Sequence, residues 1–116
     1  MKIYISGPMT GLPDLNFPAF HAEAKRLRAL GYEVVNPAEL NPDGGTWQEC
    51  MRKDIAALVE CDGIYQMPGW QDSRGATLEY QISVSLGMSI HGEGYNLYCI
   101  KDSEVFEQPI NCIFEA

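Results

Sequence analysis

The stretch GIYQMPGWQDSRGATLE, residues 63–79, decides the fold because it joins a strand, a loop and a helix. Its apolar start, residues 63–67, predicts a short buried strand, and a polar loop containing Gly69 follows. The helix that we place from about Gly75 carries Glu79, which we assign to its first turn. Backbone N–H groups at a helix start favour anions, so we expect a loop that binds phosphate or hydroxyl beside an ionised carboxylate.

Outward from this stretch, the chain alternates predicted strands and helices. The strands are placed at residues 2–6, 32–36, 63–67 and 96–100, and the helices at about 16–30, 47–60 and 75–86. This order is typical of an α/β domain with three layers, flavodoxin-like or Rossmann-like, in which helices cover both faces of a parallel sheet. With 116 residues the chain forms a single domain, residues 1–116.

Ligands of such sheets bind beyond the carboxyl ends of the strands, where we place the loops 7–12, 37–45 and 68–74. Two helix starts carry capping signals. Asn16 is predicted to cap the first helix, and Thr46 with Glu49 forms the capping-box pattern of the second. Residues 91–95 are predicted to form a loop before the last strand.

Composition narrows the possible partners and compartments. The net charge is −8, so a nucleic-acid polymer is an unsuitable partner, although nucleotide monomers remain possible ligands. We expect no membrane span, because no apolar run approaches the roughly 18 residues needed, and the N-terminus lacks a signal-peptide layout. The four cysteines show no CxxC spacing, which signals neither a zinc site nor a disulfide framework. We expect a cytoplasmic protein.

Several side chains allow both an ordinary and a functional interpretation. Glu79 either serves a reaction or stabilises its own helix by roughly 0.3–1 kcal/mol. Asp54 lies beside the apolar stripe of its helix, so it marks either the helix boundary or a cleft. Trp47 is expected in the core, whereas Trp70, in a polar loop, suits a lid or a stacking platform. The lone histidines, His21 and His91, are expected to be exposed and not catalytic.

Three elements in order resemble the nucleoside 2-deoxyribosyltransferase superfamily, especially its short phage and bacterial members. They are the start Tyr4-Ile5-Ser6-Gly7-Pro8, Asp54 with Asp62 eight positions later, and the segment SRGATLE at 73–79. The resemblance covers roughly residues 1–90. It implies that Glu79 is the nucleophile that attacks the anomeric carbon of the sugar. It also implies that Asp54 serves the departing or incoming base and that Tyr4 orients the nucleophile.

The resemblance also bears on the 5′ end of the substrate. True deoxyribosyltransferases tend to have Asp where this chain has Ser73, and relatives that hydrolyse nucleoside 5′-monophosphates have Ser. The tail Gln108-Pro109-Ile110-Asn111 instead resembles the transferases' Lys-Pro-Ile-Asn, whose Asn reaches into the site of a neighbouring subunit. By this resemblance Asn111 contacts substrate and the protein is a homo-oligomer. The inserted residues 91–95 depart from the family pattern.

We therefore expect an enzyme that cleaves the N-glycosidic bond of a (2′-deoxy)nucleoside or its 5′-monophosphate, by transfer or by hydrolysis. Ser73 with Gly75 would hold the 5′ end, and Gly7 and Met9 would line the base side. A fixed carboxylate that stabilises or traps an oxocarbenium-like state, with a second acid for the base, needs no metal or organic cofactor. One alternative is a catalytically silent protein that binds or senses a nucleotide, and another is a small interaction domain in which Glu79 is a surface acid.

Overall fold

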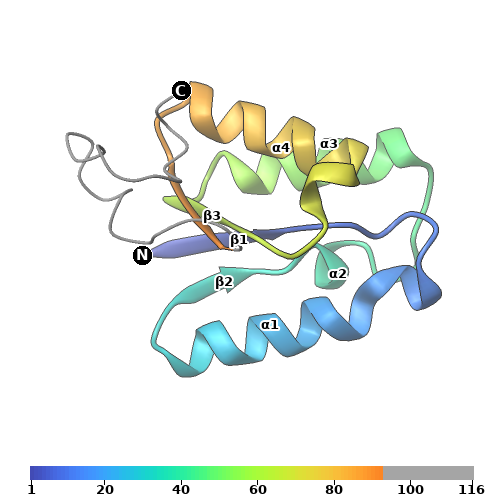
Figure 1. Cartoon of the computed structure of the whole chain (residues 1–116), viewed down its shortest axis with the longest axis horizontal. Coiled ribbons are helices and arrows are strands. Elements are labelled where there is room, and N and C mark those ends of the chain that lie inside the picture. Colours follow the sequence, from blue (N-terminus) through green and yellow to red (C-terminus); the bar gives the residue numbers. More distant parts are fainter. Residues whose placement is uncertain (93–116) are drawn as a thin grey trace.

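The computed structural model describes residues 1–92, in which four parallel strands carry helices on both faces (Figure 1). The elements are β1 (Lys2–Ser6), a 3-10 turn (Pro13–Asn16), α1 (Phe17–Ala29), β2 (Glu33–Val35), α2 (Pro37–Leu40), α3 (Trp47–Leu58), β3 (Gly63–Gln66), a 3-10 turn (Trp70–Asp72), α4 (Arg74–Ser85) and β4 (Ser89–Gly92). The sheet order is β2-β1-β3-β4. The predicted three-layer α/β fold is confirmed. No helix within residues 1–92 has the length and apolar character that crossing a membrane requires.

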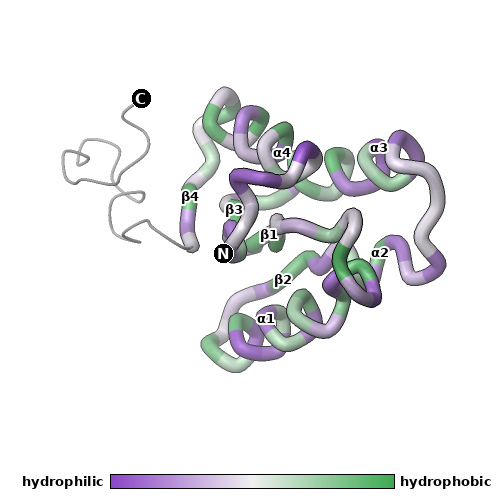
Figure 2. The backbone as a smooth tube through the Cα atoms, turned by 45° about the vertical axis from the view of Figure 1, so that its right-hand side comes forward, coloured by the Kyte–Doolittle hydropathy of each residue, from purple (hydrophilic) through white to green (hydrophobic). Residues whose placement is uncertain are grey.

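Alternation along β1 separates the two faces of the sheet. Ile3 and Ile5 belong to one buried cluster, which includes Phe20 of α1. Tyr4 belongs to the opposite cluster, together with Leu58 of α3. Figure 1 shows α1 on one side of the sheet and α3 and α4 on the other, and in Figure 2 hydrophilic and hydrophobic residues alternate along these helices. The even-numbered side chains of β1 therefore face α3 and α4.

One of the two predicted helix caps is confirmed. The backbone N–H of Glu49 donates to Thr46 Oγ1, and the N–H of Thr46 donates to Glu49 Oε1, each at 3.1 Å. Asn16 occupies the N-cap position of α1 as predicted, but its side chain makes no capping hydrogen bond: its φ is 60° and its Nδ2 donates to the carbonyl of Pro8 at 3.0 Å. In the 3-10 turn before α1, Asp14 and Leu15 also have positive φ, 53° each. The side-chain amide of Asn16, which follows them, therefore points to the loop after β1 and not to the start of the helix.

The chain around the last described strand differs from the sequence prediction. β4 covers Ser89–Gly92, so the expectation of a loop at 91–95 is wrong for its first two residues. The strand predicted at 96–100 lies outside the described residues. Ile90 is the single buried apolar side chain of β4, so the sequence of this segment shows no alternation from which a strand could be predicted. The position of β4 is instead fixed by its pairing with β3, in which Ile90 lies opposite Ile64.

A short helix also interrupts the loop predicted at residues 37–45. α2 begins after Asn36, whose side-chain oxygen accepts from the N–H of Ala38 at 3.0 Å. The helix has one turn, and such a short segment shows no apolar periodicity that a sequence pattern could reveal. The cap therefore holds it in place.

Alanine at Gly63 is expected to destabilise the β3–β4 pair. Its Cβ would lie 2.3 Å from Ser89 Oγ and 3.0 Å from the carbonyl oxygen of Ser89. Because the second contact is with backbone, the strands have to shift, and we expect a loss of about 1–3 kcal/mol in the free energy of unfolding. Urea denaturation measures it. Adding Ser89→Ala should recover only part of the loss, since the carbonyl contact persists, and full recovery would contradict this account.

Candidate active site

Glu79 lies on the second turn of α4, one turn later than the sequence analysis placed it. Its side chain is 4% exposed and points toward β1. Tyr4 Oη donates to Glu79 Oε2 at 2.7 Å, and Ser6 Oγ donates to Glu79 Oε1 at 2.6 Å. Each carboxylate oxygen therefore has its own hydroxyl donor, and the donors come from a rigid strand 73 and 75 residues earlier in the chain.

The expectation that a helix start keeps Glu79 ionised is wrong. Burial raises the pKa of Glu79 to about 7, while the hydrogen bonds from Ser6 and Tyr4 lower it and the charge of Asp54 raises it. Since Glu79 lies beyond the first turn, helix N–H groups are too distant to offset the cost of burying a charge. The protonated and ionised forms of Glu79 are thus both populated near neutral pH.

Ser6 is a site residue that the sequence analysis did not single out. It is 1% exposed and stands two positions after Tyr4 on β1, so both side chains point to the same face. This spacing of two was the available signal. It became informative only when Glu79 was placed against that face.

Asp54 lies on the inner face of α3 and is 6% exposed, so it occupies a buried position and not a helix boundary. Asn41 Nδ2 donates to Asp54 Oδ1 at 2.7 Å and also to the carbonyl of Pro37 at 3.2 Å. Burial raises the pKa of Asp54 to about 6, and the hydrogen bond from Asn41 opposes this rise. Asn41, which follows α2, was also missed by the sequence analysis.

The structure brings Asp54, Tyr4 and Glu79 into one electrostatic environment. The charge of Asp54 contributes to raising the pKa of both Glu79 and Tyr4, although burial is the larger cause for each. Two buried carboxyls that share this environment, one held by hydroxyls and one by an amide, suit nucleophilic and acid–base roles at one substrate.

The loop residues proposed to bind substrate lie in different surroundings. Ser73 is half-buried and caps α4, where its Oγ accepts from the N–H of Ala76 at 3.1 Å. Gly75 faces α3, since a Cβ there would lie 3.1 Å from Met51 Sδ. Gly7 lies against Met67, and the half-buried Met9 packs on the α1 side of the core. Asn111 lies outside the described residues.

The expectations for the two tryptophans were wrong. Trp70 is 6% exposed, and its ring lies 4.9 Å from that of Tyr80, centroid to centroid, so it is part of the packed structure. Trp47 is half-buried and carries the guanidinium of Arg74 3.7 Å from its ring centroid. A loop tryptophan thus became buried because the 3-10 turn after β3 folds back toward α4. Of the histidines, His21 is exposed as expected, whereas His91 is half-buried.

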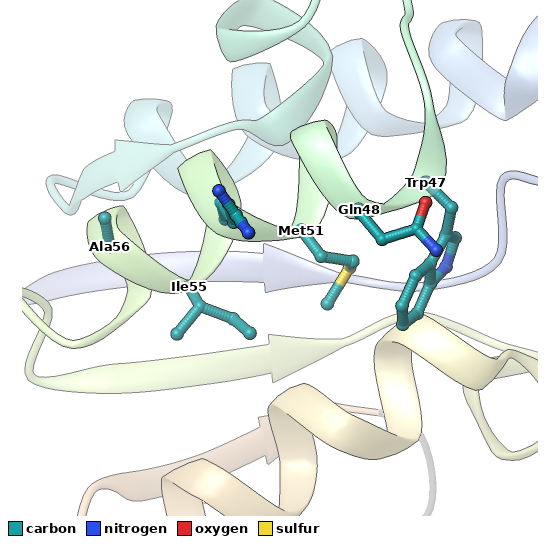
Figure 3. Close-up of a pocket in the computed structure, with 6 residues that line it drawn as sticks. Trp47, Gln48, Met51, Ile55 and Ala56 are labelled. Carbon is teal, nitrogen blue, oxygen red and sulfur yellow. The ribbon is translucent and has the colours of Figure 1, made fainter.

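An open groove of about 490 Å³ lies along α3. It is lined by Trp47, Gln48, Met51, Arg52, Ile55 and Ala56. Figure 3 shows Met51 and Ile55 on the side of α3 that faces α4. Its lining includes neither carboxyl, so this groove is distinct from the buried Glu79 site. Within residues 1–92, no three His, Cys, Asp or Glu side chains cluster as ligands for a metal ion.

The solved structures that share this fold include two deoxyribosyltransferases and an N-glycosidase. The 2-desoxiribosyltransferase from Leishmania mexicana has a TM-score of 0.63 and 18% identity over 78% of this chain, which spans 62% of that chain. The Clostridium botulinum CMP N-glycosidase BcmB has a TM-score of 0.56 and 20% identity; the match covers 79% of this chain and 67% of that chain. The 2-deoxyribosyltransferase of Bacillus psychrosaccharolyticus has a TM-score of 0.62 and 20% identity, with 94% and 93% coverage.

These likenesses confirm that the chain has a nucleoside 2-deoxyribosyltransferase-like fold. The comparison with curated protein sequences gave no match. One family model matches residues 1–92, and its description is "Domain of unknown function (DUF4406)". Because that match spans most of the chain, the protein belongs to this family.

Proposed function

We propose that the protein cleaves the N-glycosidic bond of a nucleoside or its 5′-monophosphate, with Glu79 as nucleophile. The observation that carries the proposal is the buried Glu79 carboxyl, which receives hydrogen bonds from Tyr4 and Ser6 and lies in the field of a second buried carboxyl, Asp54. The fold supports it, since structures of this fold include enzymes named 2-desoxiribosyltransferase and CMP N-glycosidase.

The residues suit a two-step reaction. The Glu79 carboxylate attacks C1′ as the C1′–N bond breaks, and the bonding electron pair leaves on the base nitrogen. Asp54 donates its proton to the departing base, since a pKa of about 6 leaves part of this carboxyl protonated near neutral pH. Water or a second base then attacks C1′ and gives a proton to the Asp54 carboxylate, while the C1′–O bond to Glu79 breaks and its electron pair returns to the Glu79 carboxylate. Tyr4 and Ser6 keep the carboxylate directed at the sugar.

Ser73 favours a 5′-monophosphate over a free nucleoside in this proposal. Its Oγ accepts a hydrogen bond from the N–H of Ala76, and its own hydroxyl hydrogen remains able to donate to a phosphate oxygen. Gly75 would lie beside that phosphate, and Gly7 and Met9 would line the base side. By the family resemblance we further propose a cytoplasmic homo-oligomer in which Asn111 completes the site of a neighbouring subunit.

Chromatography of free base tests the proposal. We expect release from at least one of the four 2′-deoxynucleosides or their 5′-monophosphates, and faster release from monophosphates. Adding a second base distinguishes transfer, which yields a new nucleoside, from hydrolysis. No release from any compound, by wild type and Glu79→Ala alike, would overturn the enzymatic role.

A silent nucleotide-binding protein is the second candidate. The observation that favours it is the 4% exposure of Glu79, which restricts attack on a sugar in the described conformation. A rise in the unfolding temperature with deoxynucleotides, without base release, would support binding alone. Absence of any shift would support neither role.

A further inference from the structure

Gln66, the last residue of β3, is fully buried. Its side-chain amide has no hydrogen-bond partner among residues 1–92. Its exposure is 0%, and both Nε2 and Oε1 lack a partner. A buried amide without partners destabilises the fold, and apolar residues of similar volume would avoid that cost. An unpaired amide at this place therefore calls for a group that arrives with a ligand.

The amide lies on the same face of the sheet as the partners of Glu79. Ile64 packs in the cluster of Tyr4, and Tyr65 packs in the opposite one, so alternation directs Gln66 to the face of Tyr4. Gln66 is also paired in register with Ser6, and neighbouring strands lie about 4.8 Å apart. Gln66 thus stands beside the hydroxyl that holds Glu79 Oε1.

Asp54 lies on α3 and Gln66 on β3, so the two side chains enter the site from different elements. The partner of Asp54, Asn41, follows α2, which comes after β2. β1, the strand of Ser6, pairs directly with β3, the strand of Gln66, so the amide lies beside the carboxyl that attacks the sugar carbon C1′ in the proposed reaction. If Asp54 serves the base, the group that meets Gln66 belongs to the sugar.

We infer that the amide of Gln66 recognises a ring hydroxyl of the sugar and so determines which sugars are cleaved. A hydroxyl both donates and accepts, which matches an amide that offers Nε2 as donor and Oε1 as acceptor. The inference rests on the proposed function. Gln66 and Glu79 are buried to a similar degree, at 0% and 4% exposure, and a substrate that reaches the Glu79 carboxylate would also reach the amide beside Ser6.

Sites that bind a substrate hydroxyl discriminate strongly against analogues that lack it, because their own polar groups are then left unpaired. We expect wild type to prefer one sugar over its analogue by on the order of 100-fold in kcat/KM. The comparison of 2′-deoxy- with 2′,3′-dideoxynucleoside 5′-monophosphates reports on the 3′-hydroxyl. The comparison of ribo- with 2′-deoxynucleotides reports on the 2′-hydroxyl.

Gln66→Met removes the amide and keeps an unbranched side chain of similar length. We expect Gln66→Met to reduce the kcat/KM preference within one of the two nucleotide pairs to roughly 3-fold or less. We also expect it to raise the urea midpoint of unfolding, since the variant buries no unpaired amide. Gln81→Leu, on the exposed side of α4, is the matched control and should leave both preferences unchanged. Gln66→Leu repeats the test with a second apolar shape.

The outcomes separate this inference from the proposed function. Wild-type turnover with both preferences unchanged in Gln66→Met would overturn the inference alone, and it would assign the amide to an internal water. Unfolding of both apolar variants would also overturn it, because the amide would then be structural. If wild type releases no base, the proposed function fails, and the same nucleotide pairs are compared by thermal shift. Equal shifts for all of them would then overturn the inference as well.

Discussion

Glutamine in place of Glu79 is expected to slow base release by roughly 10³-fold or more, because the amide cannot attack C1′. The amide is nearly the same size and can still bond with Tyr4 and Ser6, so the fold should persist. Single-turnover assays with a deoxynucleoside 5′-monophosphate measure the loss. Glu60→Gln, at an exposed position after α3, is the matched control and should retain full activity. Equal rates for Glu79→Gln and wild type would remove Glu79 from the mechanism.

The pH dependence of kcat/KM distinguishes the two carboxyls. The active form has Glu79 ionised and Asp54 protonated, so activity should be highest between the two pKa values of about 7 and about 6, and it should fall below about pH 6 and above about pH 7. Asp54→Asn should abolish the alkaline decrease. Ser6→Ala should raise the pKa of Glu79, because the hydrogen bond from Ser6 lowers it, and should therefore shift the optimum to higher pH and reduce the maximal rate. A profile that is flat from pH 5 to 8 would exclude both assignments.

The free energy of unfolding is expected to decrease as the pH rises from 5 to 8. Glu79 and Asp54 have folded pKa values of about 7 and 6, against ordinary values of 4.5 and 3.8. Between these values the folded chain binds more protons than the unfolded chain, so stability is lost as pH rises and levels off above the folded pKa. A shift of this size corresponds to about 3 kcal/mol for Glu79. Urea denaturation along the pH series measures the change.

Glu79→Gln removes the contribution of this residue to the pH dependence, because glutamine does not titrate. At pH 8 the variant should be more stable than wild type by about 3 kcal/mol at most, since it buries no charge, and at pH 4.5 the two should be alike. The Glu60→Gln control should follow the wild-type curve. If the free energy of unfolding of wild type increases from pH 5 to 8, burial does not raise the pKa values of these two carboxyls, and the description of the site is wrong.

The identity of most elements could be predicted because their signals are local. The capping box of Thr46 and Glu49, the apolar spacing of α1 and α3 and the buried run of β3 each lie within about a dozen residues. Where a signal depended on distant partners, prediction failed. β4 is placed by pairing with β3, and Trp70 is buried by packing against Tyr80.

The site divides in the same way. Glu79 and Asp54 could be singled out from their positions on predicted helices, and Tyr4 from the family resemblance. Ser6, Asn41 and Gln66 could not, because nothing local distinguishes a polar residue that ends a strand or follows a helix. Contact with residues far along the chain gives each of them its importance.

The amino-acid order by itself therefore determined a strand–helix alternation that closes into a parallel α/β sheet, and it supplied two acids on helices that meet that sheet. The tertiary structure alone decided the protonation of these acids. A pKa depends on how much water is removed from a group and which dipoles and charges surround it, and those quantities exist only after α3, α4 and β1 have packed together.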